Sequence, residues 1–116
     1  MTVSKKIALS VLAPILLFPS FPFAAGDSGT QVIKQVQITN KRVVKVWGES
    51  GNWGNPDACN KANYIILNPG TSASPNEYYS EMYVLLVSSY IQGKQISATL
   101  SGCSGNRPLI ESVRAN

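Results

Sequence analysis

The chain contains no histidine, only two cysteines and few charged residues, and each shortage excludes a class of protein. Without histidine there is no imidazole base for a hydrolase of the Ser-His-Asp type and no histidine-bearing metal site. Two cysteines are too few for a four-thiolate zinc site. Charged residues make up 14% of the 116 positions, and the 10 basic residues form no long run of the kind that a dedicated nucleic-acid binder carries.

Two features that suggest catalysis have simpler explanations. Residues 26–29 read Gly-Asp-Ser-Gly, as around the nucleophile of trypsin-like proteases, but no histidine is present to act as the base. Glu77 and Glu81 lie one helical turn apart, yet helix capping and a solvated helix face account for them. We therefore predict that the chain is not an enzyme and has no metal site and no cofactor.

The first 25 residues have the composition of a secretory signal peptide. Lys5 and Lys6 form a basic start, residues 7–18 are apolar, and Ala24-Ala25 offers a cleavage site. A membrane anchor is the alternative, although the apolar stretch is short for a span of about 20 residues and prolines interrupt it. We predict export to the periplasm or secretion, which leaves residues 26–116 as one domain with no membrane span after cleavage.

Export bears directly on the two cysteines, Cys59 and Cys103. In an oxidising compartment an even number of cysteines usually means a disulfide bond. The alternative, a reactive pair, usually needs closer spacing such as Cys-x-x-Cys. We therefore predict a Cys59–Cys103 disulfide that stabilises a small domain.

Alternating apolar and polar residues predict five β-strands in the exported domain. The expected strands cover residues 32–38, 42–47, 64–67, 96–101 and 109–114. The first two form a hairpin with a turn at Asn40-Lys41, since asparagine tolerates a positive φ. Residues 26–30 are expected to be a frayed start, and the glycine- and asparagine-rich residues 48–57 a loop.

The clearest predicted element is a helix over residues 75–92. Three residues fit the N-cap, N1 and N3 positions of a capping box: Ser74, Pro75 and Glu77. Apolar residues then recur at helical spacing, and Gly93 is a natural C-terminal stop. The stripe of tyrosines on this helix is expected to pack in the core, whereas Tyr78 beside it could face a partner subunit.

The order β-β-β-α-β-β predicts a mainly β fold with one helix. A five-stranded barrel with its helix between the third and fourth strands is the oligonucleotide/oligosaccharide-binding (OB) arrangement, and the expected elements follow that order. We predict an OB-fold-like barrel for residues 26–116. An open α+β sheet covered by one helix is the structural alternative.

Four short motifs carry a resemblance to a known family. They are Val46-Trp47-Gly48, Asp57-Ala58-Cys59, Tyr90-Ile91-Gln92-Gly93-Lys94 and Ser101-Gly102-Cys103. The chain resembles the B subunits of bacterial AB5 toxins, in the subtilase-cytotoxin and pertussis-like branch, and the small exported bacterial proteins related to them. The resemblance implies an OB-fold, a ring that is often a pentamer, binding of cell-surface glycans and no catalysis. The polar positions that hold sialic acid in the toxin subunits have no match here, so no glycan-binding residue is carried over.

Candidate ligand residues come instead from the two tryptophans and the polar loop around the second. They are Trp47, Asn52, Trp53, Asn55 and Asp57. An indole ring can stack on the apolar face of a sugar while amides and carboxylates hydrogen-bond its hydroxyl groups. Packing is the alternative for both tryptophans, for Trp47 in the core or against the helix and for Trp53 beneath its loop.

The expected function is that of an exported, non-catalytic binding domain. Its expected partner is a glycan or a protein on the host or bacterial envelope surface, and homo-oligomers are expected from the resemblance. Basic residues on the first hairpin, including Lys34 and Lys45, could attract anionic glycans or phospholipid headgroups, or form a solvated sheet face. A periplasmic protein-interaction or inhibitor module with the same fold is the alternative, and no nucleic-acid partner is expected.

Overall fold

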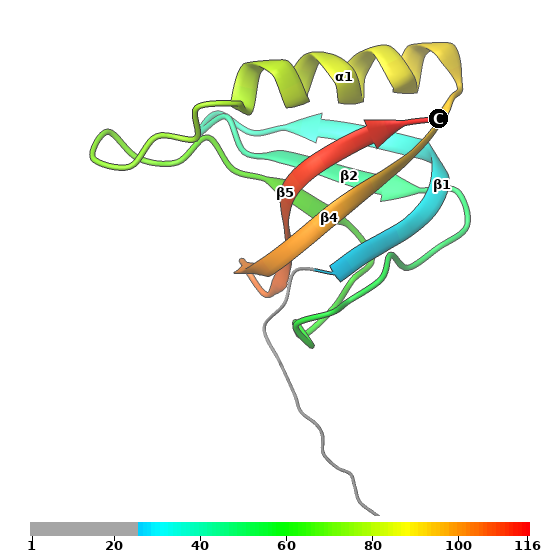
Figure 1. Cartoon of the computed structure of the whole chain (residues 1–116), viewed down its shortest axis with the longest axis horizontal. Coiled ribbons are helices and arrows are strands. Elements are labelled where there is room, and N and C mark those ends of the chain that lie inside the picture. The colour runs from blue at the N-terminus through cyan, green and yellow to red at the C-terminus, as the bar shows by residue number, and fades with distance from the viewer. Residues whose placement is uncertain (1–25) are drawn as a thin grey trace, which may run out of the picture.

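The computed structural model describes residues 26–116, so the predicted signal peptide over residues 1–25 lies outside the described residues. The described elements are, in order, β1 (Gly26–Ile38), β2 (Val44–Gly48), β3 (Ile65–Leu67), α1 (Tyr79–Gln92), β4 (Gln95–Ser104) and β5 (Arg107–Ala115). The prediction of a mainly β structure with one helix is confirmed. Figure 1 shows α1 lying across one end of the sheet, with the segment between β2 and β3 and the β4–β5 turn at the opposite end.

The five strands form one sheet that closes on itself in the order β1-β2-β3-β5-β4. Closure depends on β1, because its second half pairs with β2 and its first half pairs with β4. The ladder is irregular between Ile33 and Gln35 and again between Asp27 and Thr30. Such bulges bend a strand and increase its twist, which lets one strand serve two neighbours.

The weakest join in this closed sheet lies between β3 and β5. These two strands run parallel, and a single pair of residues, Ile66 and Leu109, is in register between them. The other four joins are antiparallel and have three or more paired residues each. We call this place the β3–β5 junction, and contacts outside the ladder are needed to hold it.

The core fills the inside of the closed sheet. Its fully buried strand residues are Val44, Val46, Ile65, Leu67, Ile96, Ala98 and Leu100. On β2 the buried Val44 and Val46 alternate with the half-buried Lys45 and Trp47, which therefore point outward. Tyr79, Met82 and Leu86 of α1 join the same core cluster from the helix end.

The start of the helix differs from the prediction. α1 begins at Tyr79 rather than at Pro75, and its N-cap, Tyr78, makes no side-chain cap hydrogen bond. Asn76 accounts for the difference, because its backbone carbonyl accepts from the Tyr79 N–H and its side-chain oxygen accepts from the Tyr78 N–H. The predicted capping box at Ser74, Pro75 and Glu77 is therefore wrong. The predicted stop at Gly93 is confirmed, with φ at +67° and its N–H directed at the Ser89 and Tyr90 carbonyls.

The N-terminal part of β1 also differs from the prediction. Residues 26–30 are not frayed but belong to β1, where Gly26 pairs with Leu100 of β4. Ser28 is buried, and its hydroxyl accepts a hydrogen bond of 2.8 Å from the Ala98 N–H. In the β1–β2 turn the positive φ falls on Arg42 (+65°) rather than on Asn40.

Candidate functional site

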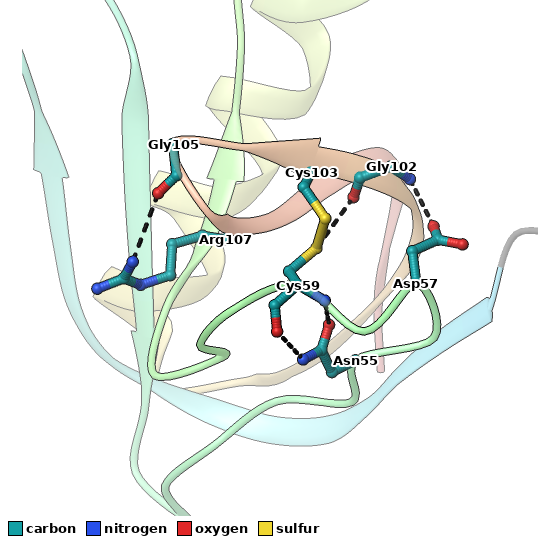
Figure 2. Close-up of a disulfide and its surroundings, with 7 residues drawn as sticks. All are labelled: Asn55, Asp57, Cys59, Gly102, Cys103, Gly105 and Arg107. Atoms are coloured by element: carbon teal, nitrogen blue, oxygen red, sulfur yellow. Dashed lines mark hydrogen bonds between the residues drawn. A yellow bond between two sulfur atoms is a disulfide. The ribbon is translucent and has the colours of Figure 1, made fainter.

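The predicted disulfide is present and joins the β2–β3 segment to β4. Cys59 and Cys103 are bonded, with their Cα atoms 5.8 Å apart and a sequence separation of 44 (Figure 2). Cys59 lies shortly before β3, and Cys103 lies near the end of β4, shortly before β5. The bond therefore ties together the two chain segments that lead into the β3–β5 junction.

Two predicted ligand residues hold this disulfide segment in place. The Asn55 side chain accepts from the Cys59 N–H and donates to the Cys59 carbonyl, at 2.8 Å each. One carboxylate oxygen of Asp57 accepts from the Gly102 N–H at 2.5 Å, as Figure 2 shows. The atoms that could have bound a sugar hydroxyl are thus largely engaged with the backbone. Their position next to a cysteine was visible in the sequence, but this structural use was not.

Trp53 is in the core rather than on the surface. It is 4% exposed and belongs to the main apolar cluster. Its indole Nε1 donates to the Val46 carbonyl at 3.0 Å, and its backbone N–H donates to the Ala62 carbonyl at 2.9 Å. Of the two alternatives that the sequence left open, the structure shows packing, so Trp53 offers no open ring face on which a sugar could stack.

Trp47 takes the opposite position, on the outside of the sheet. Its ring lies against that of Tyr64, with centroids 4.7 Å apart and planes tilted by 46°. The Arg107 guanidinium carbon lies 4.6 Å from the centroid of the Tyr64 ring, and the Lys45 ammonium lies 5.3 Å from it. We call these four residues the aromatic cluster. Each cation is within the distance at which an aromatic face attracts it.

The strand register explains why these side chains meet. Lys45 and Trp47 both point outward from β2, because side chains alternate along a strand. On the neighbouring β1, Trp47 is paired with Gln35 and Lys45 with Gln37, and both glutamines are exposed. The aromatic cluster is therefore bordered by two side-chain amides. It also lacks a balancing carboxylate, since the one ion pair within residues 26–116 joins Arg114 to Asp27 elsewhere.

Arg107 fixes one side of the aromatic cluster. Its Nε donates to the Asn63 side-chain oxygen at 2.7 Å, and one terminal nitrogen donates to the Gly105 carbonyl at 3.4 Å. Arg107 begins β5, and Asn63 precedes β3, so the contact with Asn63 crosses the β3–β5 junction. Arg107 and Tyr64 were not predicted as site residues. The local signal in the sequence was the alternation of Lys45 and Trp47, because Tyr64 follows Trp47 by 17 residues and Arg107 follows it by 60.

A polar pocket adjoins the aromatic cluster at Asn63. It has a volume of about 380 Å³, and its polar lining residues are Asn52, Asn55, Asn60, Lys61 and Asn63. Trp53 and Ala62 complete the wall. We call it the amide pocket. Asn52 and Asn55 were predicted as ligand residues and do line it, whereas Trp47 and Asp57 do not.

A second, larger hollow runs along the helix. It has a volume of about 640 Å³ and lies between α1 and the β4–β5 pair, with Met82, Leu85 and Val113 giving it an apolar lining. Glu81 and Glu111 also line it. We call it the helix groove. Tyr78, predicted to face a partner, is 65% exposed beside it.

Tyr79 links the helix to the β1–β2 turn and is structural. Its hydroxyl donates to the Arg42 carbonyl, and the Arg42 guanidinium lies 4.7 Å over its ring. Burial raises the pKa of the Tyr79 phenol above its usual value, although the positive charge of Arg42 acts in the opposite direction. The Tyr79 ring also lies parallel to that of Tyr83, with centroids 6.2 Å apart.

Within residues 26–116 no three cysteine, aspartate or glutamate side chains are placed to hold a metal ion. None of the helical residues described forms a segment long and apolar enough to cross a membrane. Comparisons with protein-family models, with curated proteins and with solved structures found no match to this chain. The resemblance to toxin B subunits therefore stays a prediction from the four sequence motifs.

Proposed function

We propose that this protein is an exported, non-catalytic binding protein that recognises a glycan through the aromatic cluster. The observation that carries the proposal is the outward Trp47–Tyr64 pair, flanked by Lys45 and Arg107 on the outer face of the sheet. Trp47 was already a candidate from its residue type. Trp53 is buried, which supports placing the ligand surface on β2 and at Tyr64, just before β3, rather than on the loop.

The chemistry of this surface suits a sugar. A sugar ring has an apolar C–H face, which stacks on an indole, and polar edges, which need hydrogen-bond partners. Trp47 is half-buried and therefore held in place, while Gln35 and Gln37 next to it supply amide donors and acceptors. Lys45 and Arg107 favour a glycan that carries a carboxylate or sulfate group, because no carboxylate of the described residues pairs with them.

The topology supports an OB-fold assignment, which we also propose. The closed order β1-β2-β3-β5-β4 and the helix between β3 and β4 are those expected for that fold. OB-folds bind oligosaccharides and oligonucleotides on the face of their second and third strands. Trp47 lies on β2, and Tyr64 directly precedes β3. Together with the four motifs, this supports a relationship to toxin B subunits, with residues 1–25 as the secretory signal.

The test is a glycan array probed with the full chain, expressed for export in bacteria and recovered with its disulfide intact. We expect binding to a defined set of glycans and at least a tenfold loss of affinity in Trp47→Ala, since an aromatic anchor in an interface is typically worth about 2 kcal/mol. Ile38→Ala is the control, because Ile38 is an exposed large apolar residue outside both the aromatic cluster and the helix. No binding to acidic or neutral glycans, or unchanged binding by Trp47→Ala, would contradict the proposal.

One observation favours the alternative of a protein-interaction or inhibitor module. The helix groove combines an apolar lining with Glu81 and Glu111, a pattern that suits an apolar, basic segment of another protein. That function predicts one protein captured from envelope extract, loss of capture in Leu85→Glu, and no effect of Trp47→Ala. Opposite results for these two variants separate the two functions.

A further inference from the structure

The amide pocket is a polar hollow that lies beside the proposed glycan surface. Its volume of about 380 Å³ lies near the lower end of the usual range for ligand pockets, about 300–1,000 Å³. A space of that size holds one small polar unit rather than a long chain. The side chains that line the pocket determine which chemical unit it can bind.

The side chains that line the amide pocket divide into engaged and available groups. Asn55 is engaged with Cys59, and the oxygen of Asn63 accepts from Arg107. Over residues 26–116, no hydrogen bond joins the side chains of Asn52, Asn60 or Lys61 to another protein group. Two amides and an ammonium group are therefore available for a ligand that enters the pocket.

The available groups suit hydroxyl groups better than cationic ones. An asparagine side chain both donates and accepts hydrogen bonds, and so does a sugar hydroxyl group. No carboxylate lines the pocket, which makes it a poor site for a cation or an amine. Lys61 adds three further donors, which hydroxyl oxygens can accept.

The backbone holds the walls of the amide pocket firmly. The Trp53 N–H donates to the Ala62 carbonyl at 2.9 Å, and the Lys61 N–H donates to the Asn106 carbonyl at 3.1 Å. The disulfide at Cys59 lies between these two contacts in the chain. A site whose walls are already ordered loses less conformational entropy on binding.

The amide pocket is also continuous with the aromatic cluster. Asn63 lines the pocket and directly precedes Tyr64, and the Asn63 oxygen is bonded to Arg107, which lies over the Tyr64 ring. A ligand stacked on Trp47 that extends past Tyr64 and Arg107 reaches the pocket. We propose that the amide pocket is a second sugar subsite, so that the protein recognises an oligosaccharide of two or more units rather than a single terminal sugar. This subsite rests on the proposed glycan function.

The experiment compares fragments of increasing length. The probes are fragments of one, two, three and four units, cut from the glycan that gives the strongest array signal, and their affinities are measured by calorimetry with the disulfide-bonded full chain. We expect affinity to rise at least tenfold between one unit and the longer fragments. The double variant Asn52→Ala/Asn60→Ala should lose this gain while keeping its affinity for the single unit.

Two controls make the result specific. Asn40→Ala removes an exposed asparagine from the β1–β2 turn, far from the pocket, and should leave every affinity unchanged. Trp47→Ala should weaken binding of all fragments. In NMR spectra, the side-chain amide signals of Asn52 and Asn60 should shift with the four-unit fragment and stay in place with the single unit.

Three outcomes would overturn the second subsite. Equal affinity for one and four units would show that no second unit is bound. An unchanged gain in Asn52→Ala/Asn60→Ala would place the second unit elsewhere, and a weaker single-unit affinity in that variant would make the pocket the primary site. Each of these leaves glycan binding itself intact, whereas an array without any bound glycan would reject the proposed function and the subsite together.

Discussion

At the scale of single residues, the Arg107 side chain contacts three other groups. Its guanidinium contacts the Asn63 side chain, the Gly105 carbonyl and the Tyr64 ring. The first and third of these contacts cross the β3–β5 junction, where the ladder itself has one residue pair. One side chain thus supports the closure of the sheet and shapes the aromatic cluster. Lysine could not replace it, because only a planar guanidinium combines in-plane hydrogen bonds with stacking on a ring.

The Tyr79 hydroxyl links the helix to the β1–β2 turn, and its contribution to stability can be tested. Tyr79→Phe leaves the Arg42 carbonyl without its donor, which should lower the free energy of unfolding by about 1 kcal/mol at pH 7. The folded pKa of Tyr79 lies above the unfolded value of about 10, so the contribution is complete below pH 10 and is lost as the pH rises through the folded pKa. Urea unfolding between pH 7 and 11 should show the gap to wild type closing above pH 10. Tyr90→Phe is the control, and a gap that stays constant to pH 11 would contradict the assignment.

The sequence was enough to predict the disulfide partners, but it did not reveal the structural roles of the candidate ligand residues. The disulfide partners followed from there being two cysteines in a chain predicted to be exported. Asn55, Asp57 and Trp53 have the composition of a ligand loop, yet two of them bond to backbone groups and the third fills the core. These roles depend on where the fold places residues 59, 102 and 46. Neither the composition nor the spacing of the sequence gives those positions.

At the scale of elements, the segment between β2 and β3 has no regular structure but is held by backbone hydrogen bonds. Its backbone donates to Ala62 from Trp53, to Ser28 from Gly54 and to Asn106 from Lys61. Gly54 fits only without a side chain, because a Cβ there would lie 2.4 Å from the Asp27 carbonyl oxygen. The segment is therefore a framework for the amide pocket rather than a mobile loop.

The disulfide joins this segment to β4, and we expect its loss to destabilise the protein. Cys59→Ser/Cys103→Ser should lower the free energy of unfolding by about 4 kcal/mol, because the cross-link closes a loop of more than 40 residues in the unfolded chain. Urea unfolding of the wild type in dithiothreitol should give the same value as the double variant in buffer. A loss below about 1 kcal/mol would mean that the segment is held by its hydrogen bonds alone.

The predicted elements had the right type, and their errors lie at the ends. The helix was placed four residues too early because Ser74, Pro75 and Glu77 matched a capping box by spacing. In the structure the preceding segment folds back on itself, with a bridge between Gly70 and Pro75 and Asn76 bonded to Asn68. Such a competing local structure cannot be weighed from helix signals alone. The first residues of β1 were missed because their partner strand, β4, lies about 70 residues away.

At the scale of the whole molecule, exposed apolar residues concentrate on the helix. Within residues 26–116, the large apolar side chains that stay exposed are Ile38, Tyr78, Val84, Tyr90 and Ile91. All but Ile38 lie on α1 or directly before it. Exposed apolar side chains of this kind suit contacts between copies of a protein. We propose that the protein forms homo-oligomers, as the resemblance to toxin B subunits implies, through the helix.

Light scattering after size-exclusion chromatography tests this assembly. We expect the disulfide-bonded protein to elute as an oligomer at tens of micromolar, and Ile91→Glu to elute as a monomer, because it places a charge on a residue that is 76% exposed in one copy. Ile38→Glu is the matched control, since Ile38 is 46% exposed outside the helix. A monomeric wild type, or equal effects of the two variants, would contradict assembly through the helix.

The β3–β5 junction has a consequence for where this protein can persist. With one residue pair in its ladder, the junction depends on the Cys59–Cys103 bond and on Arg107. In a reducing compartment the junction would lose the disulfide, and opening it would turn a sheet without free edges into one with two, along β3 and β5. Unpaired strand edges act as templates for other chains and lead to aggregation. The disulfide thus opposes aggregation through strand edges as well as unfolding.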